Sequence, residues 1–438
     1  MNTPMNLDLD AWWMPFTANR EFKKHPRIIQ RAEGAYFQDA DGRRVFDGLS
    51  GLWTCGAGHN RAEINRAVLD QLQTLDYSPP FQFGHPGAFE LARRVADLMP
   101  PGLDRIFFTN SGSEAVETAL KMARAYWRLK GKASKTLLVG RDKGYHGVNF
   151  GGTHVGGIGP NRLMFGDGPS TDHLGHTLLP GNAFSRGQPA AGAALAEQLE
   201  TIVARHDAST IAAVIVEPVA GSAGVIPPPV GYLDRLRALC DKHDILLIFD
   251  EVITGLGRMG AVTGSAAFGV RPDLITLAKQ LTNGVIPMGA VAVRRDIHDT
   301  FMQQDTPEYL LEFPHGYTYS GHPVACAAAH ASLDILEKDG LIQRVAAMAP
   351  VFEDAIHSLK GEPHVLDIRN YGFAGALTLE PYPGEPARRP HEVAMRCWQR
   401  GFYVRYGGDT IQLGLPFITE TEEINRLIDA LRESLRAG

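Results

Sequence analysis

Lys279 follows the apolar run 274–278 and is the residue with the most suggestive chemistry in this chain. Lysine is rarely buried, and burial lowers the pKa of its amine and makes the amine a nucleophile. Such a lysine can form a Schiff base with a carbonyl compound. A side chain that extends to solvent is the ordinary alternative, and the residue taken alone favours that alternative slightly.

Asp250 comes directly after a second apolar run, 245–249. An unpaired buried carboxylate costs free energy, so it needs a cationic or hydrogen-bonding partner. The protonated ring nitrogen of a bound cofactor would serve, and a structural salt bridge or a cap is the ordinary alternative. Asp250 therefore predicts one of these contacts.

Two further segments could bind a phosphate group and a planar ring. Residues 109–114, Thr-Asn-Ser-Gly-Ser-Glu, join a strand to a helix and would offer free N–H groups and the positive end of a helix dipole to an anion. A plain helix cap on Ser113 is the simpler alternative. Tyr145, followed by His146, could stack on a planar ring or could simply pack within its loop.

A sheet is needed to bring these segments together. Short apolar runs alternate with amphipathic stretches between residues 105 and 293, which predicts an α/β fold with a mostly parallel sheet covered on both faces. Ligands of such sheets bind beyond the carboxyl ends of the strands. The expected strands are 105–109, 136–140, 211–216, 245–249, 273–278 and 290–293, and a helix is expected from 113 to about 130.

The flanking parts of the chain predict a second domain. Residues 34–47 alternate around Asp41-Gly42 as in a β-hairpin, and a helical period begins near residue 62. An alanine-rich helix follows Pro323, and helices and strands are mixed beyond it. We expect a large domain over 61–325, a small α+β domain over 326–438, and an N-terminal segment over 1–60 that joins the small domain.

Composition limits the function classes. A chain of 438 residues with 44% apolar and 21% charged residues is typical of a globular protein with two domains. The net charge of −6 and the absence of a basic run argue against a nucleic-acid partner. The chain has no run of 18 apolar residues, so its sequence does not predict a membrane span. The start of the chain does not resemble a secretory signal. Four widely separated cysteines predict reduced thiols, so we expect a cytoplasmic protein.

Two patterns suggest other activities, and both are weak. Residues 255–260, Gly-Leu-Gly-Arg-Met-Gly, match the GxGxxG pattern of nicotinamide enzymes, but the glycines and proline within 261–272 do not predict the helix that this motif opens. Four histidines have no cysteine or glutamate at ligand spacing, so we expect no metal site: His146, His154, His173 and His176. A serine hydrolase would need a GxSxG motif, which the chain lacks.

Taken in chain order, these segments resemble the class III aminotransferases, which are fold-type-I enzymes that depend on pyridoxal phosphate. The resemblance runs nearly end to end and is carried by residues 111–115, 247–258, 272–279 and 313–323. Residues 49–59, 145–149 and 401–409 are similar to the ω-amino acid:pyruvate, or β-alanine:pyruvate, aminotransferases. The departures are Met259, where that family usually has threonine, and residues 413–416, which lie toward the expected substrate side.

The resemblance implies a role for each site residue. Lys279 would hold the cofactor as a Schiff base and later act as the general base, and Asp250 would pair with the ring nitrogen. Arg405 would grip a substrate carboxylate and swing outward for other substrates. The remaining roles are these: Ser111, Gly112 and Ser113 at the phosphate, with Thr318 from a neighbouring subunit; Tyr145 and Val252 on the two ring faces; His146 and Glu217 beside the ring; and Phe16, Trp53 and Tyr145 as apolar walls of the substrate pocket.

The implied activity is ping-pong transamination in a homodimer or homotetramer. An ω-amino acid such as β-alanine, or a primary amine, would donate its amino group, and pyruvate would accept it to give alanine. Other class III aminotransferases, of the 4-aminobutyrate or ornithine type, and a glutamate-1-semialdehyde-type aminomutase are the alternatives within the same chemistry. A nicotinamide oxidoreductase and a binding protein without catalysis are the alternatives outside it.

Overall fold

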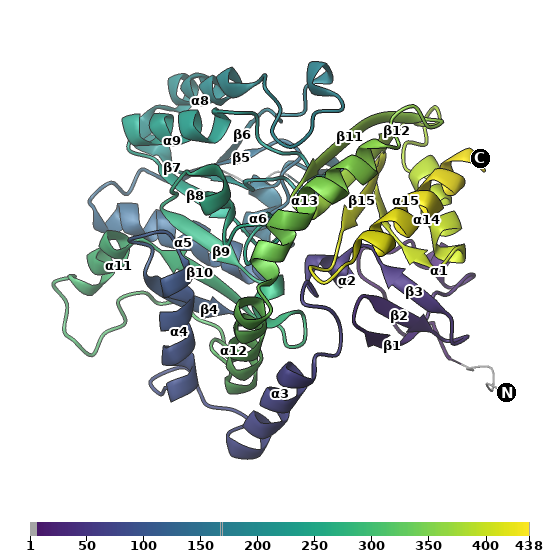
Figure 1. The fold of residues 1–438 in the computed structure, drawn as a ribbon. Coiled ribbons are helices and arrows are strands. Elements are labelled where there is room, and N and C mark those ends of the chain that lie inside the picture. The colour runs from purple at the N-terminus through teal and green to yellow at the C-terminus, as the bar shows by residue number, and fades with distance from the viewer. Residues whose placement is uncertain (1–6, 167, 169, 438) are drawn as a thin grey trace.

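The computed structural model describes residues 7–166, 168 and 170–437 of the chain. A larger body contains the central sheet, and a smaller body lies beside it with helix α13 (Leu341–His357) between them (Figure 1). The first and the last of the described residues, 7 and 437, both lie at the smaller body. Among the residues described, no helix is long and apolar enough to cross a membrane.

The central sheet has seven strands, and all but one of them run parallel, which confirms the predicted sheet. β10 is the exception and pairs antiparallel with both of its neighbours. Only residues 278–288 separate it from β9, and a connection this short cannot carry a crossover to a parallel strand. The strand order is β4 (Arg105–Thr109), β10 (Gly289–Val293), β9 (Leu274–Leu277), β8 (Leu246–Asp250), β7 (Ile211–Val216), β5 (Leu137–Arg141) and β6 (Thr171–Leu174).

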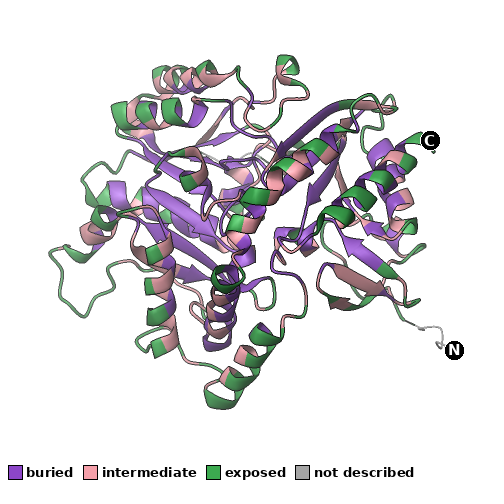
Figure 2. Cartoon of the chain, in the orientation of Figure 1, coloured by how far each residue is buried: buried purple, intermediate pink, exposed green. Residues whose placement is uncertain are grey.

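Helices cover this sheet, and the strands between them are buried (Figure 2). Every residue of β7, β8 and β9 is buried, as expected for strands covered on both faces. The helices of this body are α3 (Ala62–Thr74), α4 (Pro86–Leu98), α5 (Gly112–Leu129), α6 (Phe150–Val155), α7 (Gly159–Phe165), α8 (Gln198–His206), α9 (Tyr232–Lys242), α10 (Gly264–Phe268), α11 (Arg295–Met302) and α12 (Pro323–Lys338). Short 3₁₀ turns are η1 (Pro180–Asn182), η2 (Ala193–Glu197), η3 (Ala208–Thr210) and η4 (Lys279–Thr282).

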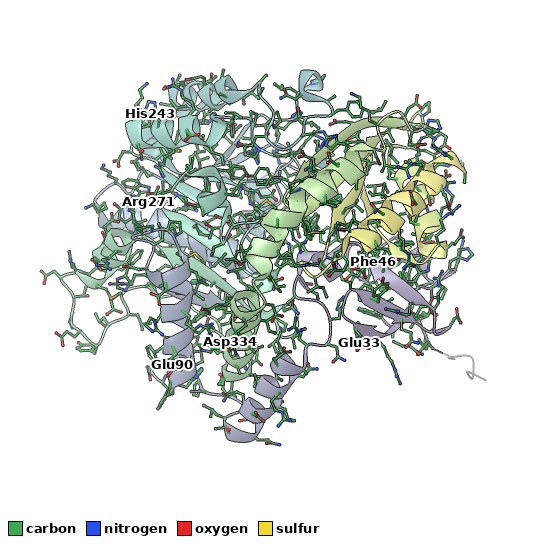
Figure 3. All side chains as sticks on the ribbon, in the orientation of Figure 1. Glu33, Phe46, Glu90, His243, Arg271 and Asp334 are labelled. Atoms are coloured by element: carbon green, nitrogen blue, oxygen red, sulfur yellow. The ribbon has the colours of Figure 1, made fainter. Side chains whose placement is uncertain are left out.

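The smaller body is built from both ends of the chain. The predicted hairpin forms as β2 (Tyr36–Asp39) and β3 (Arg44–Asp47), and β13 (Phe402–Tyr403) pairs in parallel with β3. Phe46, labelled in Figure 3, is buried there and lies 6.0 Å from Phe402 between ring centres. The other elements are α1 (Asn19–Phe22), β1 (Ile29–Glu33), α2 (Ser50–Trp53), the antiparallel sheet β11 (Val365–Tyr371), β12 (Ala374–Leu379), β15 (Thr410–Gly414) and β14 (Arg405–Gly407), and helices α14 (Arg388–Gln399) and α15 (Thr421–Arg436).

The glycine-rich turn 255–260 joins the two bodies and does not begin a helix. The next helix, α10, starts at Gly264 and has five residues, so the geometry of a dinucleotide site is missing from this turn. Arg258 of the turn is buried and donates hydrogen bonds to the Leu415 carbonyl and the Ser50 hydroxyl. Burial lowers the pKa of Arg258 to about 9. The motif therefore acts as a clamp between the two ends of the chain.

Candidate active site

Three of the predicted residues lie at the ends of adjacent strands. Asp250 is the last residue of β8, Glu217 follows β7, and Lys279 lies two residues beyond β9. The sheet order β9-β8-β7 places these ends side by side at the carboxyl edge. This edge is where open α/β sheets bind their ligands.

Asp250 is buried and held by three hydrogen bonds. One carboxylate oxygen lies 2.8 Å from Nδ1 of His146, and the other accepts from the Thr276 hydroxyl at 3.1 Å and the Val252 amide at 3.2 Å. Within the described part of the chain Asp250 pairs with His146 and with no lysine or arginine, so the structural partner that its sequence allowed is a histidine. The carboxylate is therefore oriented, and it has a lone pair left for one further cationic donor.

Lys279 has an unusual backbone conformation and an amine whose pKa is lowered. Its φ of 48° lies in the left-handed region, which a non-glycine residue adopts only when its surroundings hold it there. Burial lowers the pKa of the Lys279 amine to about 8, against the negative charges of Asp250 and Glu217, which raise it. At pH 7 most of this amine is still charged, and it becomes the neutral nucleophile near pH 8.

Glu217 is buried and fixes the backbone around the site. Its carboxylate accepts hydrogen bonds from the amides of Tyr145 and Gly221, both at 2.9 Å. Burial raises the pKa of Glu217, and the nearby His146 acts in the opposite direction. Glu217 thus positions the loop that carries the predicted ring-stacking residue Tyr145.

The predicted phosphate turn caps helix α5 at Ser111, not at Ser113. The Ser111 hydroxyl accepts from the Glu114 amide at 3.2 Å, whereas the Ser113 hydroxyl accepts from the Val148 amide at 3.1 Å. The amides of Gly112 and Ser113 have no acceptor among the described residues, so an anion could bind them. A Cβ on Gly112 would lie 2.7 Å from Val252, so only glycine leaves this close approach open.

Arg405 lies on β14 and is partly buried. In the described ranges it has neither an ion pair nor a side-chain hydrogen bond, so it does not serve as one half of a surface salt bridge. Its positive charge lowers the pKa of Lys279 and of Tyr145, although burial raises the pKa of Tyr145 more strongly. The site therefore contains an unpaired guanidinium near the reactive amine.

The other predicted residues differ in how they are placed. Phe16 is exposed, and its ring meets that of Tyr145 edge-on at 6.4 Å. Trp53 is buried, packs against Gly414, and has the Arg258 guanidinium 5.7 Å from its ring centre. Thr318 is exposed, and its carbonyl accepts from the Tyr77 hydroxyl at 3.1 Å.

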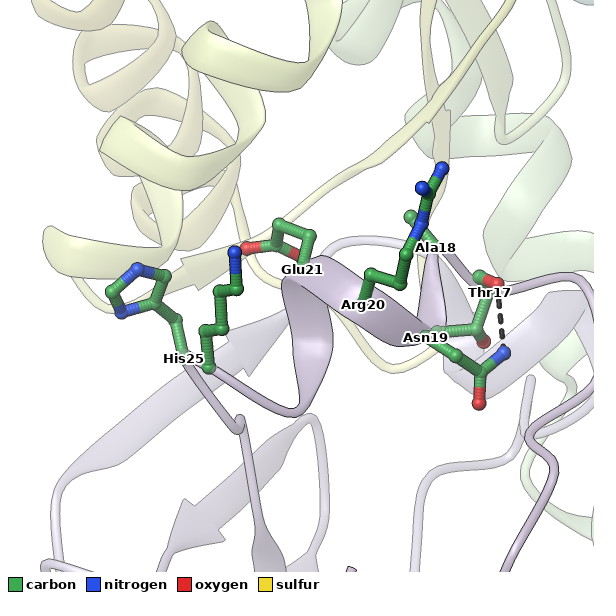
Figure 4. A pocket seen from close by; sticks show the side chains of 7 residues that line it. Thr17, Ala18, Asn19, Arg20, Glu21 and His25 are labelled. Carbon is green, nitrogen blue, oxygen red and sulfur yellow. Dashed lines mark hydrogen bonds between the residues drawn. The ribbon is translucent and has the colours of Figure 1, made fainter. Parts of the chain in front are cut away.

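The surface pocket beside Phe16 contains none of the predicted site residues. It has a volume of about 670 Å³ and is lined by residues 17–21, 24 and 25 around helix α1, with Asn19 donating to the Thr17 carbonyl at 2.9 Å (Figure 4). Arg20 and His25 point in different directions there, so the pocket does not gather charge at one point. We assign no chemistry to it.

Sequence reasoning missed the residues that hold the segment 49–59 against the active lysine. Gln280 accepts from the Gly56 amide at 2.8 Å, and Asn283 accepts from the Ala57 amide at 2.9 Å. Thr276, which binds Asp250, was also missed. Their position in the sequence was the available signal. Thr276 lies within the buried strand β9, and Gln280 and Asn283 lie in the turn after it, as Lys279 does.

His59 is the last residue of the segment 49–59, and its protonation should make the free energy of unfolding depend on pH. Its Nε2 lies 2.7 Å from Asp47; burial opposes its charge, but the hydrogen bonds with Asp47 and Cys55 outweigh burial and raise its pKa from 6.5 to about 9. A raised folded-state pKa stabilises the fold fully below pH 6.5, and this stabilisation disappears as pH rises through about 9. We expect His59→Asn to cost about 2 kcal/mol at pH 6 and far less at pH 9.5. Urea unfolding at both pH values measures this, and an equal cost would contradict it.

The site's own features fit pyridoxal phosphate. Asp250 offers an oriented buried carboxylate, Gly112 leaves a space that a Cβ would fill, and His146 has a buried Nε2 with no partner among the described residues. The Lys279 amine has no hydrogen-bond partner there either. A carboxylate for a ring nitrogen, free amides for a phosphate and an unpaired amine for an aldehyde are what this cofactor requires.

Comparisons with known proteins agree with this geometry. Residues 17–435 match the family model described as aminotransferase class-III. The chain is 58% identical to a β-alanine–pyruvate aminotransferase of Pseudomonas aeruginosa, covering 99% of both chains, and 58% identical to an ω-amino acid–pyruvate aminotransferase of Pseudomonas putida, covering 98% of this chain and 96% of that one. A solved amine transaminase from an uncultivated Pseudomonas species, in a pyridoxal-phosphate-bound form, superposes with a TM-score of 0.90 at 37% identity over 98% of each chain.

Proposed function

Because this chain belongs to the class-III aminotransferases, we propose that it transfers the amino group of an ω-amino acid such as β-alanine, or of a primary amine, to pyruvate. The observation that carries the choice of substrates is the unpaired Arg405 near Lys279. One substrate has a carboxylate beside its reacting carbon and the other does not, so a guanidinium without a fixed partner suits both. The names of the two Pseudomonas relatives support the same substrates.

The cofactor and the chain would divide the chemistry between them. Bound pyridoxal phosphate supplies an aldehyde that takes the amino group and a ring that accepts electrons. Asp250, held by His146, would keep the ring nitrogen protonated, and Val252 would pack against the ring. The amides of Gly112 and Ser113 would bind the phosphate. We assign these roles to the residues as part of the proposal.

Lys279 would carry the proton. Because about half of its amine is neutral at mildly alkaline pH, Lys279 would act as the base that takes a proton from the substrate carbon and holds it at Nζ. Glu217 holds the Tyr145 backbone in place during this transfer. Tyr145 and Phe16 would cover the reacting atoms from solvent.

A panel of amine donors with pyruvate as fixed acceptor tests the proposal. We expect β-alanine to be used with alanine as the product, and 4-aminobutyrate and ornithine to be used less efficiently. Preference for 2-oxoglutarate over pyruvate would favour the 4-aminobutyrate or ornithine type. Turnover without any added keto acid would indicate an aminomutase.

The low pKa of Lys279 gives a second measurable expectation. Cofactor-free protein should take up pyridoxal phosphate about tenfold faster at pH 9 than at pH 7, because the neutral fraction of an amine with a pKa near 8 rises by about that factor. Absorbance at the cofactor band follows the uptake. Pyridoxine phosphate, which has no aldehyde, is the control. An uptake rate that rises equally for both compounds would assign the change to another group.

A homodimer or homotetramer is part of the proposal. Thr318 lies in the loop between α11 and α12, where Tyr309 and Leu311 are 85% and 74% exposed, as residues at a subunit contact would be in one isolated chain. If Thr318 serves the neighbouring subunit, mixed dimers of Lys279→Ala and Thr318→Val chains contain one intact site. Activity above the sum of the two separate variants supports this. Activity equal to that sum would place Thr318 in its own subunit's site.

The cytoplasm is the compartment that we propose. All four cysteines are free, and burial raises the pKa of Cys240 and Cys326 to about 12, so these thiols stay protonated. Fractionation of cells with detection of the protein in each fraction tests this placement.

A further inference from the structure

Gln412 of β15 is buried, and only one end of its side-chain amide is satisfied. Its Nε2 donates to the Ser222 carbonyl at 2.8 Å and to the Thr410 hydroxyl at 3.4 Å. Its Oε1 is also buried and has no hydrogen-bond partner among the described residues. The Ser222 contact identifies the two ends, because a carbonyl can accept only from the amide nitrogen. A buried oxygen without a donor costs free energy, so Oε1 calls for a donor.

Arg405 is the residue directly opposite Gln412. The antiparallel ladder between β14 and β15 pairs these two positions. Residues that are opposite in such a ladder have side chains on the same face of the sheet, with Cβ atoms about 4.5–5.5 Å apart. An arginine side chain can span that separation, and the guanidinium of Arg405 has no partner of its own in the described ranges. An unsatisfied acceptor and an unsatisfied donor therefore share one step of the ladder.

The same face of this sheet holds the loop that follows Glu217. Gln412 is opposite Ala376 of β12, and Ala376 is opposite Arg369 of β11, so one row of side chains crosses all four strands. Arg369 donates to the Gly224 carbonyl at 2.9 Å, in the loop whose Ser222 carbonyl is bound by Gln412. The face that Gln412 and Arg405 share is therefore turned toward the active-site side of the molecule.

Electrostatics agree with this placement of Arg405. Burial has the largest effect on the pKa of Lys279, which it lowers, and on the pKa of Tyr145, which it raises; the positive charge of Arg405 lowers both. Gln412 lies inward of Arg405, because β15 is an inner strand of this sheet and β14 is an edge strand. A hydrogen bond to Oε1 would thus draw the guanidinium inward, away from solvent.

We propose that Oε1 of Gln412 accepts a hydrogen bond from the guanidinium of Arg405 and holds it in the orientation that binds a substrate carboxylate. A guanidinium has five N–H donors, so two can bind the carboxylate while another is held by Gln412. Gln412 is then a positioning residue that favours substrates with a carboxylate and touches no reacting atom. This inference rests on the function proposed above and adds a residue to it.

A neutral amide suits this role better than a carboxylate would. A negative charge at position 412 would pair with Arg405 and cancel the charge that attracts the substrate. A single hydrogen bond to a neutral oxygen leaves that charge in place. It can also break when a substrate without a carboxylate requires the guanidinium to swing outward.

Kinetics of the holoenzyme with Gln412→Met, which keeps the length of the side chain, test the inference. We expect KM for pyruvate and for β-alanine to rise about tenfold, with kcat changed less than about twofold, because the lost contact supports ground state and transition state alike. The inhibition constant of propionate, a carboxylate that cannot react, should rise by about the same factor. Single-turnover use of an aryl amine without a carboxylate should change less than about twofold.

The same change in the Arg405→Ala protein is the control. Gln412 has no guanidinium to hold there, so Gln412→Met should cause no further loss with pyruvate or β-alanine. If Gln412 acts only by holding the loop at Ser222, use of the aryl amine should fall by the same factor as use of β-alanine. The loss should then also persist without Arg405. Either result overturns the inference.

Gln412→Glu provides a second test in case the methionine variant does not fold, which its thermal unfolding shows. Its carboxylate would pair with Arg405, so use of pyruvate and β-alanine should fall at least about tenfold while use of the aryl amine is retained. Equal losses for all donors overturn the inference. The proposed function fails separately, if the unaltered protein does not transfer an amino group from β-alanine to pyruvate.

Discussion

Replacing Lys279 with alanine should abolish transamination and the visible absorption band of the bound cofactor. The variant loses both the covalent attachment and the group that moves the proton, so we expect kcat to fall by at least about 10,000-fold. Steady-state assays with β-alanine and pyruvate, together with an absorption spectrum of the purified protein, measure the two effects. Full turnover in this variant would refute the assignment of the site.

Lys135 provides a matched control for that experiment. It is also buried, and burial lowers its pKa, but its ammonium donates to three backbone carbonyls: those of Ala208, Ile211 and Asp244. Lys135→Met should therefore lower stability and leave the visible band in place. The contrast separates a lysine that the fold satisfies from Lys279, which has no such partner within the described residues.

Replacing Arg405 with alanine should separate the two kinds of substrate. We expect kcat/KM for pyruvate and for β-alanine to fall about 100-fold, because a two-pronged contact with a carboxylate is lost. The half-reaction with an aryl amine that has no carboxylate should change less than about threefold. Single-turnover spectra with each donor measure these values, and equal losses for all donors would reject the role.

Arg405→Lys refines the same experiment. Lysine keeps the positive charge but cannot form two parallel hydrogen bonds to one carboxylate. An intermediate loss of pyruvate use would therefore indicate that geometry as well as charge matters. A loss as large as that of the alanine variant would assign the whole effect to geometry.

The sequence predicted the large sheet because its strands are buried on both faces. The strands at 105–109 and 211–216 agree with the structure residue for residue. The second is continuously apolar, and the first has the apolar run Ile-Phe-Phe between Arg105 and Thr109. β6 was missed, because Thr-Asp-His-Leu is not apolar. The residues of β10 do not predict its direction, because the direction depends on the length of the connection from β9. The division into domains at residues 60 and 325 stays a prediction; the second point falls inside α12.

The site was predictable as a set of strand ends but not as a set of contacts. Lys279 and Asp250 stand out in sequence because a charged residue ends each apolar run. That His146 is the residue that binds Asp250 required the fold, since 104 positions separate them. The sequence predicts the helix cap at Ser113, two residues after its actual position at Ser111. Both serines suit a cap, and only the backbone decides between them.

The pairing of β3 with β13 has a consequence for how the protein is made. Arg43, in the turn between β2 and β3, donates to the carbonyl of Trp398, which is 355 residues later in the chain. At about 5–20 residues per second, a ribosome needs roughly 20–70 s to synthesise that interval. During this time the β3 edge of the N-terminal sheet has no partner strand, so the smaller body can be completed only when translation is nearly finished.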